Sequence, residues 1–333
     1  MTFDAAMRLA MAQAEQVKGS TYPNPPVGAV ILDAGGDVVA VGGTEPAGGA
    51  HAEVVALRRA GERARGGAAV VTLEPCNHHG RTPPCVDALV AAGVSTVVFA
   101  VPDPNPVAAE GAQALQRAGV TTVPGVLAGE VAGSSLREWL HKVRTARPHV
   151  TWKYAASLDG RSAAADGSSQ WITSVEARAD VHLRRAAADA IVVGTGTVFA
   201  DDPTLTARRP DGTRYDSQPL RVVVGEREIP SAARVLNNDA ATVLIRSHDP
   251  VEVLRALADR TDVFLEGGPT LASAFLRAGV VDRILAYVAP LLLGGPGAAV
   301  SDVGVPDITG ALRWRFDGVD RIGPDLRLSL IPN

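Results

Sequence analysis

The chain has 333 residues, which is long enough for two domains of ordinary size. Hydrophobic residues make up 46% of the chain and aromatic residues only 4%, so each half can build a core that must be rich in Val, Leu and Ala. The net charge of −4 and the isoelectric point near 6.0 argue against a nucleic-acid-binding protein, which usually carries a basic face.

Two features predict where the protein works. The N-terminus lacks the basic start and apolar run of a secretory signal, and no apolar stretch reaches the roughly 18 residues that span a bilayer. The two cysteines of the chain suit a reducing compartment if they are free thiols. We therefore expect a cytoplasmic protein that binds neither a membrane nor a nucleic acid.

The first half alternates helical and strand patterns. A helix is predicted at residues 4–18, because Ala6, Leu9, Ala10 and Ala14 form one apolar stripe. The other predicted elements are a hairpin of strands at 27–32 and 38–41, a helix at 52–60, a strand at 69–73, a helix from residue 85, a strand at 96–101, a helix at 107–119, a strand at 121–126 and a helix at 135–145. This order predicts a three-layer α/β sandwich.

The most informative stretch lies between residues 51 and 85. It contains His51-Ala52-Glu53 and the two cysteines of the chain, Cys76 and Cys85. One histidine and two thiolates are three zinc ligands, and a catalytic zinc keeps its fourth position open for water. Glu53 can carry a proton for that water without binding the metal, as in the zinc-dependent base deaminases. Both His51 and Cys85 are predicted at helix starts. The free N–H groups at the start of a helix would stabilise the thiolate of Cys85.

Other interpretations of the two cysteines remain open. They could form a disulfide, although the chain shows no secretory signal. They could be inert buried thiols, which are common, or part of a structural zinc site, which would normally have four protein ligands. The combination of His51, Glu53, Cys76 and Cys85 favours catalytic zinc.

The second half predicts another α/β domain. The boundary is placed at Arg147-Pro148-His149, which makes the domains residues 1–147 and 148–333. Strands are predicted from residue 150 to a turn at 159–160 and at 190–193, 220–224, 242–245, 263–265, 284–288 and 326–330, with helices at 174–188 and after Pro269. The run from Gly194 to Phe199 is not a dinucleotide fingerprint, because Phe199 takes the place of the third glycine. Glu266-Gly267-Gly268-Pro269 before a helix suits an anion site, although an ordinary tight turn fits as well.

Two sets of motifs resemble one family. Residues 22–28 and 72–85, with eight residues between the cysteines, resemble the deaminase half of the bifunctional riboflavin-biosynthesis enzyme. Residues 153–160, 170–173, 200–203 and 266–269 resemble its reductase half. That enzyme joins a diaminohydroxyphosphoribosylaminopyrimidine deaminase to a 5-amino-6-(5-phosphoribosylamino)uracil reductase, and the resemblance covers nearly the whole chain.

This resemblance implies an α/β fold class, with an N-terminal cytidine-deaminase-like three-layer sandwich plus a C-terminal dihydrofolate-reductase-like domain. It implies two cofactors, Zn2+ and NADPH. Zinc-bound hydroxide would deaminate 2,5-diamino-6-(5-phosphoribosylamino)pyrimidin-4-one, and NADPH would then reduce the ribosyl side chain to ribityl. The expected partner is this small phosphoribosyl pyrimidine, and we expect the chain to form a homo-oligomer.

The resemblance also implies roles for individual residues. NADPH would be held by Ala155, Trp171, Thr197, Asp201, Gly268, Pro269, Thr270 and Leu271. Substrate would be held by Asn24, in the stiff loop at residues 21–26, and by Ser169, Arg185, Leu205, Arg208 and Glu266.

Four residues have alternative interpretations, and a fifth departs from the family pattern. Lys153 and Asp201 are candidates for polar help at the carbon that is reduced, although each could be a surface or folding residue. His78 and Arg81 are either solvated loop residues or contacts to a substrate phosphate or ribose. The family often has a histidine at the position of Thr44, which puts one substrate contact in question.

Three other functions fit parts of the sequence. The chain could be a deaminase of another base or nucleotide with an inactive or unrelated second domain, a non-enzymatic zinc module, or a fusion with one active half. The acidic isoelectric point and the long cysteine spacing count against the first. Glu53 counts against the second, and the motifs of both halves count against the third.

Overall fold

The computed structural model of the chain describes residues 1–78, 83–105 and 110–333. These residues form two compact units, Met1–Ala146 and Arg147–Asn333. The boundary predicted from the sequence lies one residue further along the chain. Within the described ranges, no helix is both long and apolar enough to cross a bilayer.

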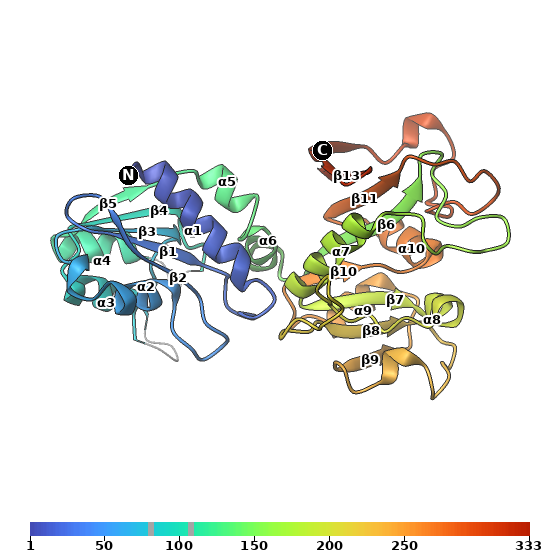
Figure 1. Cartoon of the computed structure of the whole chain (residues 1–333), viewed down its shortest axis with the longest axis horizontal. Coiled ribbons are helices and arrows are strands. Elements are labelled where there is room, and N and C mark those ends of the chain that lie inside the picture. The colour runs from blue at the N-terminus through green and yellow to red at the C-terminus, as the bar shows by residue number, and fades with distance from the viewer. Residues whose placement is uncertain (79–82, 106–109) are drawn as a thin grey trace. The chain divides into compact units, whose positions relative to one another are not determined.

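The first unit is built on a five-stranded sheet with the order β2-β1-β3-β4-β5 (Figure 1). Its strands are β1 (Gly28–Leu32), β2 (Val38–Gly43), β3 (Ala68–Leu73), β4 (Thr96–Val101) and β5 (Thr121–Pro124). β1 pairs antiparallel with β2 and β3, whereas β3, β4 and β5 are parallel. Every residue of β1 and β3 is buried, which explains their almost uninterrupted apolar sequences.

Helices cover both faces of this sheet, so the predicted three-layer sandwich is confirmed. They are α1 (Phe3–Val17), α2 (Ala52–Ala60), α3 (Cys85–Ala92), α4 (Gly111–Arg117), α5 (Ala128–Ala132) and α6 (Arg137–Thr145), with a 3₁₀ turn at Gly61–Ala64. Two adjacent glycines of β2 show the layering. A Cβ on Gly42 would strike Ala52 of α2, and one on Gly43 would strike Val17 of α1. Successive strand residues point to opposite faces, so α1 and α2 lie on opposite sides of the sheet.

Two helices of the first unit differ from the prediction. A helix is predicted at residues 107–119. Residues 107–109 lie outside the described residues, and the described helix α4 runs from Gly111 to Arg117. Glu110 has a left-handed φ of 71°, so a right-handed helix cannot continue back through it. α5 is not predicted at all, because its five residues are too few to show an apolar period.

The second unit is built on an eight-stranded sheet with the order β12-β13-β11-β6-β10-β7-β8-β9. Its strands are β6 (His149–Ser157), β7 (Ala190–Gly194), β8 (Leu220–Val224), β9 (Thr242–Ile245), β10 (Asp262–Leu265), β11 (Arg283–Ala289), β12 (Trp314–Ile322) and β13 (Asp325–Pro332). Neighbours from β11 to β9 are parallel, and β13 pairs antiparallel with β11 and β12. The chain therefore runs outward from β6 through β7, β8 and β9 and returns by β10, which inserts between β6 and β7.

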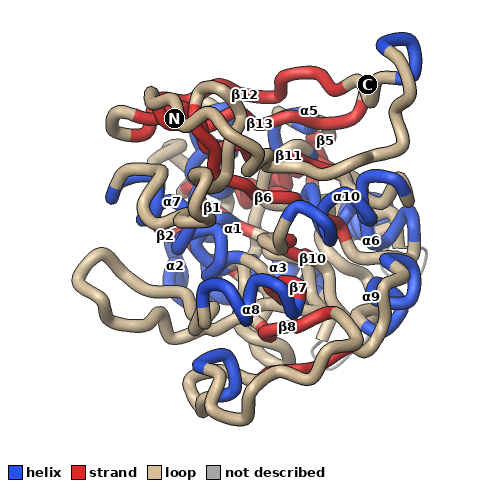
Figure 2. Tube along the Cα trace, turned by 90° about the vertical axis from the view of Figure 1, so that its right-hand side faces the viewer, coloured by secondary structure: helices blue, strands red, loops and turns tan. Residues whose placement is uncertain are grey.

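Helices cover both faces of this sheet as well. They are α7 (Val175–Ala187), α8 (Thr195–Asp201), α9 (Pro250–Ala256) and α10 (Pro269–Arg277), with 3₁₀ turns at Arg234–Leu236 and Ile308–Gly310. α9 and α10 share one apolar core with the sheet, and α7 and α8 share another. Along β7, Ala190 and Val192 belong to the first core, and Ile191 and Val193 belong to the second. The strands, in red, and the helices, in blue, can be followed in Figure 2.

Three elements of the second unit are not predicted from the sequence. β12 is mostly exposed and carries Arg315, Asp317 and Arg321, so no apolar strand pattern marks it. α8 and α9 have seven residues each, which is too short for helical periodicity to stand out. α8 also takes in residues 200 and 201, the first two residues of the motif at 200–203.

Candidate active sites

The three predicted zinc ligands lie together in the first unit. His51 Nδ1 is 3.2 Å from Cys85 Sγ and 3.5 Å from Cys76 Sγ. All three ligand atoms lie within 4.8 Å of one another, and theirs is the one such cluster in the part of the chain that the structure describes. A tetrahedral zinc ion with bonds of about 2.0–2.3 Å spaces its ligands by roughly 3.5 Å, so these side chains fit that metal.

Two helix starts and one strand end position these ligands. His51 is the N-cap of α2 and Cys85 is the first residue of α3, which confirms the predicted helix starts. Cys76 follows β3, and the backbone N–H of Cys85 donates to its sulfur at 3.4 Å. The Cys85 thiol, His51 and this N–H lower the pKa of Cys76 to about 4, which suits a thiolate ligand.

Glu53 lies in the first turn of α2, two residues after His51, and is 4% exposed. Burial raises the pKa of its carboxyl group, and the charge on Cys76 raises it further. A carboxyl group with a raised pKa beside a metal site can accept a proton and return it near neutral pH.

A cavity of about 410 Å³ lies beside the ligands within the first unit. Asn24 and His78, both predicted substrate contacts, line it together with His51 and Glu53. His78 Nδ1 is buried and has no hydrogen-bond partner within the described ranges, so it is free to bind a ligand. Arg81, the other predicted contact of this loop, lies outside the described residues.

Four polar or aromatic residues of the cavity wall are absent from the prediction: Glu74, Asp103, Asn105 and Trp139. The two carboxylate oxygens of Glu74 accept hydrogen bonds from the backbone N–H groups of Asp103, at 3.2 Å, and Ala112, at 2.9 Å. Glu74 thereby fastens the segment after β4 and the first turn of α4 to the metal loop. Polar residues directly after the buried strand β4 are the signal that could have located Asp103 and Asn105.

Thr44, at the position where the family often has a histidine, also lines the cavity and is buried. Its hydroxyl accepts from the N–H of Val27 at 3.1 Å and donates to the carbonyl of Val27 at 3.4 Å. The Thr44 hydroxyl therefore uses its donor and one acceptor position on the backbone that leads into β1. Thr44 fixes the exit of the loop that carries Asn24.

In the second unit, Lys153, Arg185 and Glu266 form a buried ion cluster. Arg185 donates to the two oxygens of Glu266 at 2.6 and 2.9 Å, and Lys153 Nζ lies 4.0 Å from one of them. Burial opposes the charge on Glu266, but Arg185 and Lys153 outweigh it and lower its pKa to about 2. Burial lowers the pKa of Lys153. Ala155 lies two residues along β6 from Lys153 and so on the same face of the sheet.

α7 also holds the predicted substrate segment at residues 205–208. Arg185 donates to the carbonyl of Thr206 at 3.2 Å, and His182 Nδ1 accepts from the N–H of Arg208 at 3.2 Å. Burial, Arg185 and Arg208 lower the pKa of His182 to about 4, so its ring is neutral at pH 7. Leu205 is buried with a φ of 51°, a strained conformation that these contacts maintain. His182 is a further residue that the prediction misses.

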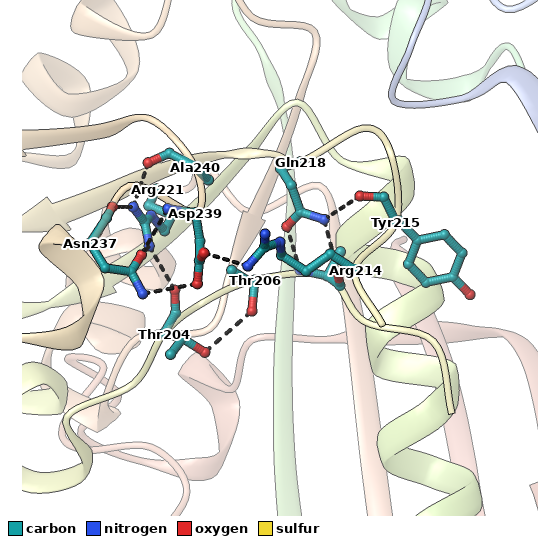
Figure 3. Close-up of polar contacts among 10 residues, drawn as sticks. Thr204, Thr206, Arg214, Tyr215, Gln218, Arg221, Asn237, Asp239 and Ala240 are labelled. Carbon is teal, nitrogen blue, oxygen red and sulfur yellow. Dashed lines mark hydrogen bonds and ion pairs between the residues drawn. The ribbon is translucent and has the colours of Figure 1, made fainter. Parts of the chain in front are cut away.

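A buried arginine fastens the residue just before this segment. Arg221 is fully buried, and its guanidinium donates to the carbonyl of Thr204 at 3.1 Å and to the side-chain oxygen of Asn237 at 2.8 Å. It also donates to the backbone carbonyls of Asn237 and Ala240. Figure 3 shows these acceptors gathered around the guanidinium. Together they offset the cost of burying its charge.

Five of the predicted NADPH contacts lie at the carboxyl ends of parallel strands. Thr197 is in α8, which directly follows β7, and residues 268–271 form the start of α10, which follows β10. A Cβ on Gly267 would lie 3.3 Å from the nitrogen of Gly194, so the two turns adjoin. Open parallel sheets bind dinucleotides where the strand order reverses, as it does here between β7 and β10. Gly268 caps α10 and Pro269 follows at its first position, a helix start suited to an anion. These residues fit a dinucleotide phosphate.

The remaining predicted contacts make two pairwise interactions. Ser169 Oγ donates to Asp201 at 3.4 Å, and the guanidinium of Arg178 stacks 4.4 Å above the exposed ring of Trp171. Asp201 and Lys153 are both candidates for the same reacting carbon. Among the described residues these two share no ion pair, since Lys153 lies against Glu266 instead.

Both halves of the chain match known families. Residues 2–101 match the cytidine and deoxycytidylate deaminase zinc-binding region, and residues 148–328 match the RibD C-terminal domain. The chain is 68% identical to the riboflavin biosynthesis protein RibD of Mycobacterium tuberculosis, over 99% of this chain and 97% of that protein. The chain belongs to the RibD family.

Solved structures and more distant relatives agree with this membership. The RibD of Escherichia coli is 39% identical over 98% of each chain. The structure of Acinetobacter baumannii RibD has a TM-score of 0.89 at 38% identity, and that of the Thermotoga maritima deaminase/reductase has 0.88 at 33%, each over 99% of both chains.

As a RibD protein, the chain is a bifunctional deaminase and reductase of riboflavin biosynthesis, with Zn2+ and NADPH as its cofactors. The predicted fold class is confirmed, with a cytidine-deaminase-like first unit and a reductase second unit. The matches to both halves set aside a non-enzymatic zinc module and an unrelated second domain.

Proposed function

We propose that this RibD chain deaminates 2,5-diamino-6-(5-phosphoribosylamino)pyrimidin-4-one in its first unit and then reduces the ribosyl side chain of the product to ribityl in its second. The observation that carries the proposal is the cavity of the first unit. There the metal ligands and Glu53 share one space with Asn24 and with the free Nδ1 of His78. The Thermotoga maritima relative is named for a deaminase and a reductase of the same substrate class.

In the deaminase site, each residue has one task. His51, Cys76 and Cys85 would hold a zinc ion, which supplies a water-derived nucleophile at neutral pH. Glu53 would accept a proton from the attacking water and pass it to the ring nitrogen. It would then take the proton of the newly added hydroxyl group and pass it to the amine, which leaves as ammonia while the ring carbonyl forms. Its burial in the first turn of α2 holds its carboxyl group beside the ligands. Asn24 would pair with the edge of the pyrimidine ring.

In the reductase site, the ion cluster of Lys153, Arg185 and Glu266 would lie beside the carbon that is reduced. NADPH, when bound, supplies a hydride. Ring opening of the ribosylamine gives an imine, and its reduction also needs a proton at the imine nitrogen. Lys153 can deliver that proton, because burial lowers the pKa of its ammonium group. Glu266, which Arg185 keeps ionised, would accept hydrogen bonds from the hydroxyl groups of the opened sugar.

Arg208 is the residue that we assign to the substrate phosphate. Its Nε is buried and has no hydrogen-bond partner in the described part of the chain. Burial lowers its pKa, and Arg185 and Arg234 lower it further, so several cations converge where an anion would relieve their repulsion. Arg185 uses three of its N–H groups on Glu266 and Thr206, so it would act mainly by positioning these residues.

The experiment that tests the proposal incubates zinc-loaded protein with the diaminopyrimidine ribosyl phosphate, with and without NADPH. We expect ammonia release without NADPH, followed by NADPH oxidation that depends on the deaminated product. No ammonia from a protein that contains zinc would reject the substrate assignment. Ammonia without any NADPH oxidation would reject the proposed second reaction.

The role of Glu53 has its own test. Glu53→Gln keeps the size of the side chain but cannot carry the proton, so ammonia release should fall by at least about 100-fold. The zinc content should stay at the wild-type value, because Glu53 is not among the ligand atoms. Glu62→Gln is the matched control, since Glu62 lies on the surface of the same unit. Unchanged ammonia release from Glu53→Gln would contradict the role.

A further inference from the structure

One arginine at the carboxyl edge of the second sheet has no acidic partner. Arg227 follows β8 by three residues, and its guanidinium stacks 4.7 Å above the ring of Phe199 in α8. Among the described residues no carboxylate lies within 4 Å of this guanidinium, and the neighbouring Glu228 pairs with Arg246 instead. The charge of Arg227 therefore has no counterion within the described chain.

Within the described chain the N–H groups of Arg227 make no hydrogen bond, so its donors are available to a ligand. The N–H groups of a guanidinium point outward in its plane, so a ring below that plane orients the group without using its donors. Phe199 is the residue that breaks the glycine fingerprint after β7. In the structure the ring of Phe199 packs against the guanidinium of Arg227.

Arg227 lies in a row of turns along the carboxyl edge of the sheet, after β8 and next to the edge strand β9. Across the sheet the strand order is β6, β10, β7, β8, with Lys153 on β6 and Glu266 directly after β10. The starts of α10 and α8 come next in the row, and a Cβ on Gly196 of α8 would lie 3.5 Å from Arg227 Nη2. Three strand spacings of about 4.8 Å separate β6 from β8. A dinucleotide with its nicotinamide at the ion cluster and its diphosphate at α10 would carry its adenosine to Arg227.

We propose that Arg227 binds the 2′-phosphate of NADPH and so sets the preference for NADPH over NADH. The inference rests on the proposed function, because it places the cofactor along this edge. NADPH and NADH differ only in a phosphate on the adenosine ribose, and an arginine is the usual means of accommodating it. Arg227 meets the requirement because Phe199 lies against its guanidinium, its donors make no hydrogen bond within the described chain, and it follows β8 along the same edge of the sheet. Its contact with the phosphate would be a charge-assisted, bidentate hydrogen bond.

The test measures the dissociation constants of NADPH and NADH for the full-length protein by quenching of tryptophan fluorescence. Arg227→Gln should weaken NADPH binding by about 10- to 100-fold and leave NADH binding within about twofold of the wild type. Phe199→Leu removes the aromatic ring that packs against Arg227 and should weaken NADPH binding by about threefold, again without an effect on NADH binding. Arg246→Gln is the matched control, because it removes an equal charge after β9 that Glu228 already neutralises. It should change neither constant.

The outcomes separate this inference from the function on which it rests. Equal weakening of NADPH and NADH by Arg227→Gln would overturn the inference, because the residue would then act on the fold or on a shared part of the cofactor. Unchanged NADPH binding would also overturn it, while the reductase assignment would stand. A wild-type protein that binds neither dinucleotide would reject the cofactor site itself.

Discussion

Burial and neighbouring charges hold single side chains of the reductase unit in defined protonation states. Burial works against the charge of Glu266, yet Arg185 and Lys153 lower its pKa to about 2. His182 stays neutral because burial, Arg185 and Arg208 lower its pKa to about 4. Only a neutral imidazole offers a ring nitrogen as an acceptor, so this protonation state is what allows His182 to hold the backbone of Arg208.

His182 therefore makes the stability of the second unit depend on pH. The folded-state pKa of about 4 lies below the ordinary value of 6.5, so between these values the unfolded chain binds a proton that the folded chain does not. The resulting stability is present above pH 6.5 and is lost as the pH falls to about 4. His182→Asn keeps an acceptor for Arg208 but cannot titrate. Urea unfolding across this window should show the wild type losing on the order of 1–3 kcal/mol more than the variant.

The exposed His248 supplies the control for this experiment. His248→Asn should reproduce the pH dependence of the wild type. If His182→Asn lost stability on acidification as steeply as the wild type, the titration of His182 would not be the cause.

Single side chains can be predicted from the sequence when their chemistry is uncommon, but not when they act on backbone groups far away in the chain. His51, Glu53, Cys76 and Cys85 are predictable because few residue types bind zinc and their helix-start positions follow from local patterns. Glu74, Thr44 and His182 could not be predicted, because the N–H groups that they hold lie 17 to 38 residues away in the chain. Such pairings exist only after the sheet has formed.

Glu74 connects three elements, so its substitution should affect both the stability of the fold and the position of the cavity wall. Its carboxylate joins the loop after β3 to the segment after β4 and to α4. Glu74→Gln would place an amide N–H against one of these backbone donors, and we expect a loss of about 1–3 kcal/mol in unfolding free energy. Asp103 and Asn105 would shift in the cavity wall, so the KM for deamination should rise by roughly tenfold with little change in kcat.

Two measurements distinguish positioning by Glu74 from a direct part in the chemistry. Zinc content should match the wild type, and steady-state ammonia release should separate kcat from KM. The surface variant Glu62→Gln should change neither. A large fall in kcat with KM unchanged would show that Glu74 acts on the reacting groups themselves.

Close packing of helix on sheet supplies a further prediction at this scale. A Cβ on Gly28 of β1 would lie 1.8 Å from the carbonyl oxygen of Ala10, so α1 rests directly on the strand. Gly28→Ala should therefore cost about 3 kcal/mol or more through overpacking. Gly129→Ala, in α5, meets nothing within 4 Å and should be neutral or stabilising by up to about 1 kcal/mol. Chemical denaturation should show a loss of unfolding free energy for Gly28→Ala and no loss for Gly129→Ala. An equal loss of unfolding free energy in both variants would refute the packing argument.

Elements are predictable from sequence when burial imposes a pattern. β3, β4, β8 and β9 lie within a residue of their predicted bounds, and α2 coincides with its prediction. β12 lies at the exposed edge of the sheet, where charged residues replace the apolar pattern. The strand order of the second sheet is also hidden, because nothing in the local sequence of β10 shows that it inserts between β6 and β7.

At the scale of the whole molecule, each described site is built from one unit. The residues that line the cavity lie between Pro23 and Trp139, within Met1–Ala146. The ion cluster and the turns assigned to NADPH lie within Arg147–Asn333. Each unit also has apolar cores of its own. A variant that disables one site should therefore leave the other working in the same chain.

Two such variants test how the deaminated product reaches the second site. Glu53→Gln lacks the proton carrier of the first reaction, and Glu266→Gln lacks the carboxylate of the second. Because the described residues of each site lie within one unit, the product should dissociate into solution and be captured by any chain with a working reductase. An equimolar mixture should convert the starting pyrimidine and oxidise NADPH after a lag, at about half the rate of the same total concentration of wild type. Each variant alone should perform only its own half-reaction. If the mixture released ammonia without oxidising NADPH, while Glu53→Gln still reduced added deaminated product, transfer would require both sites on one chain.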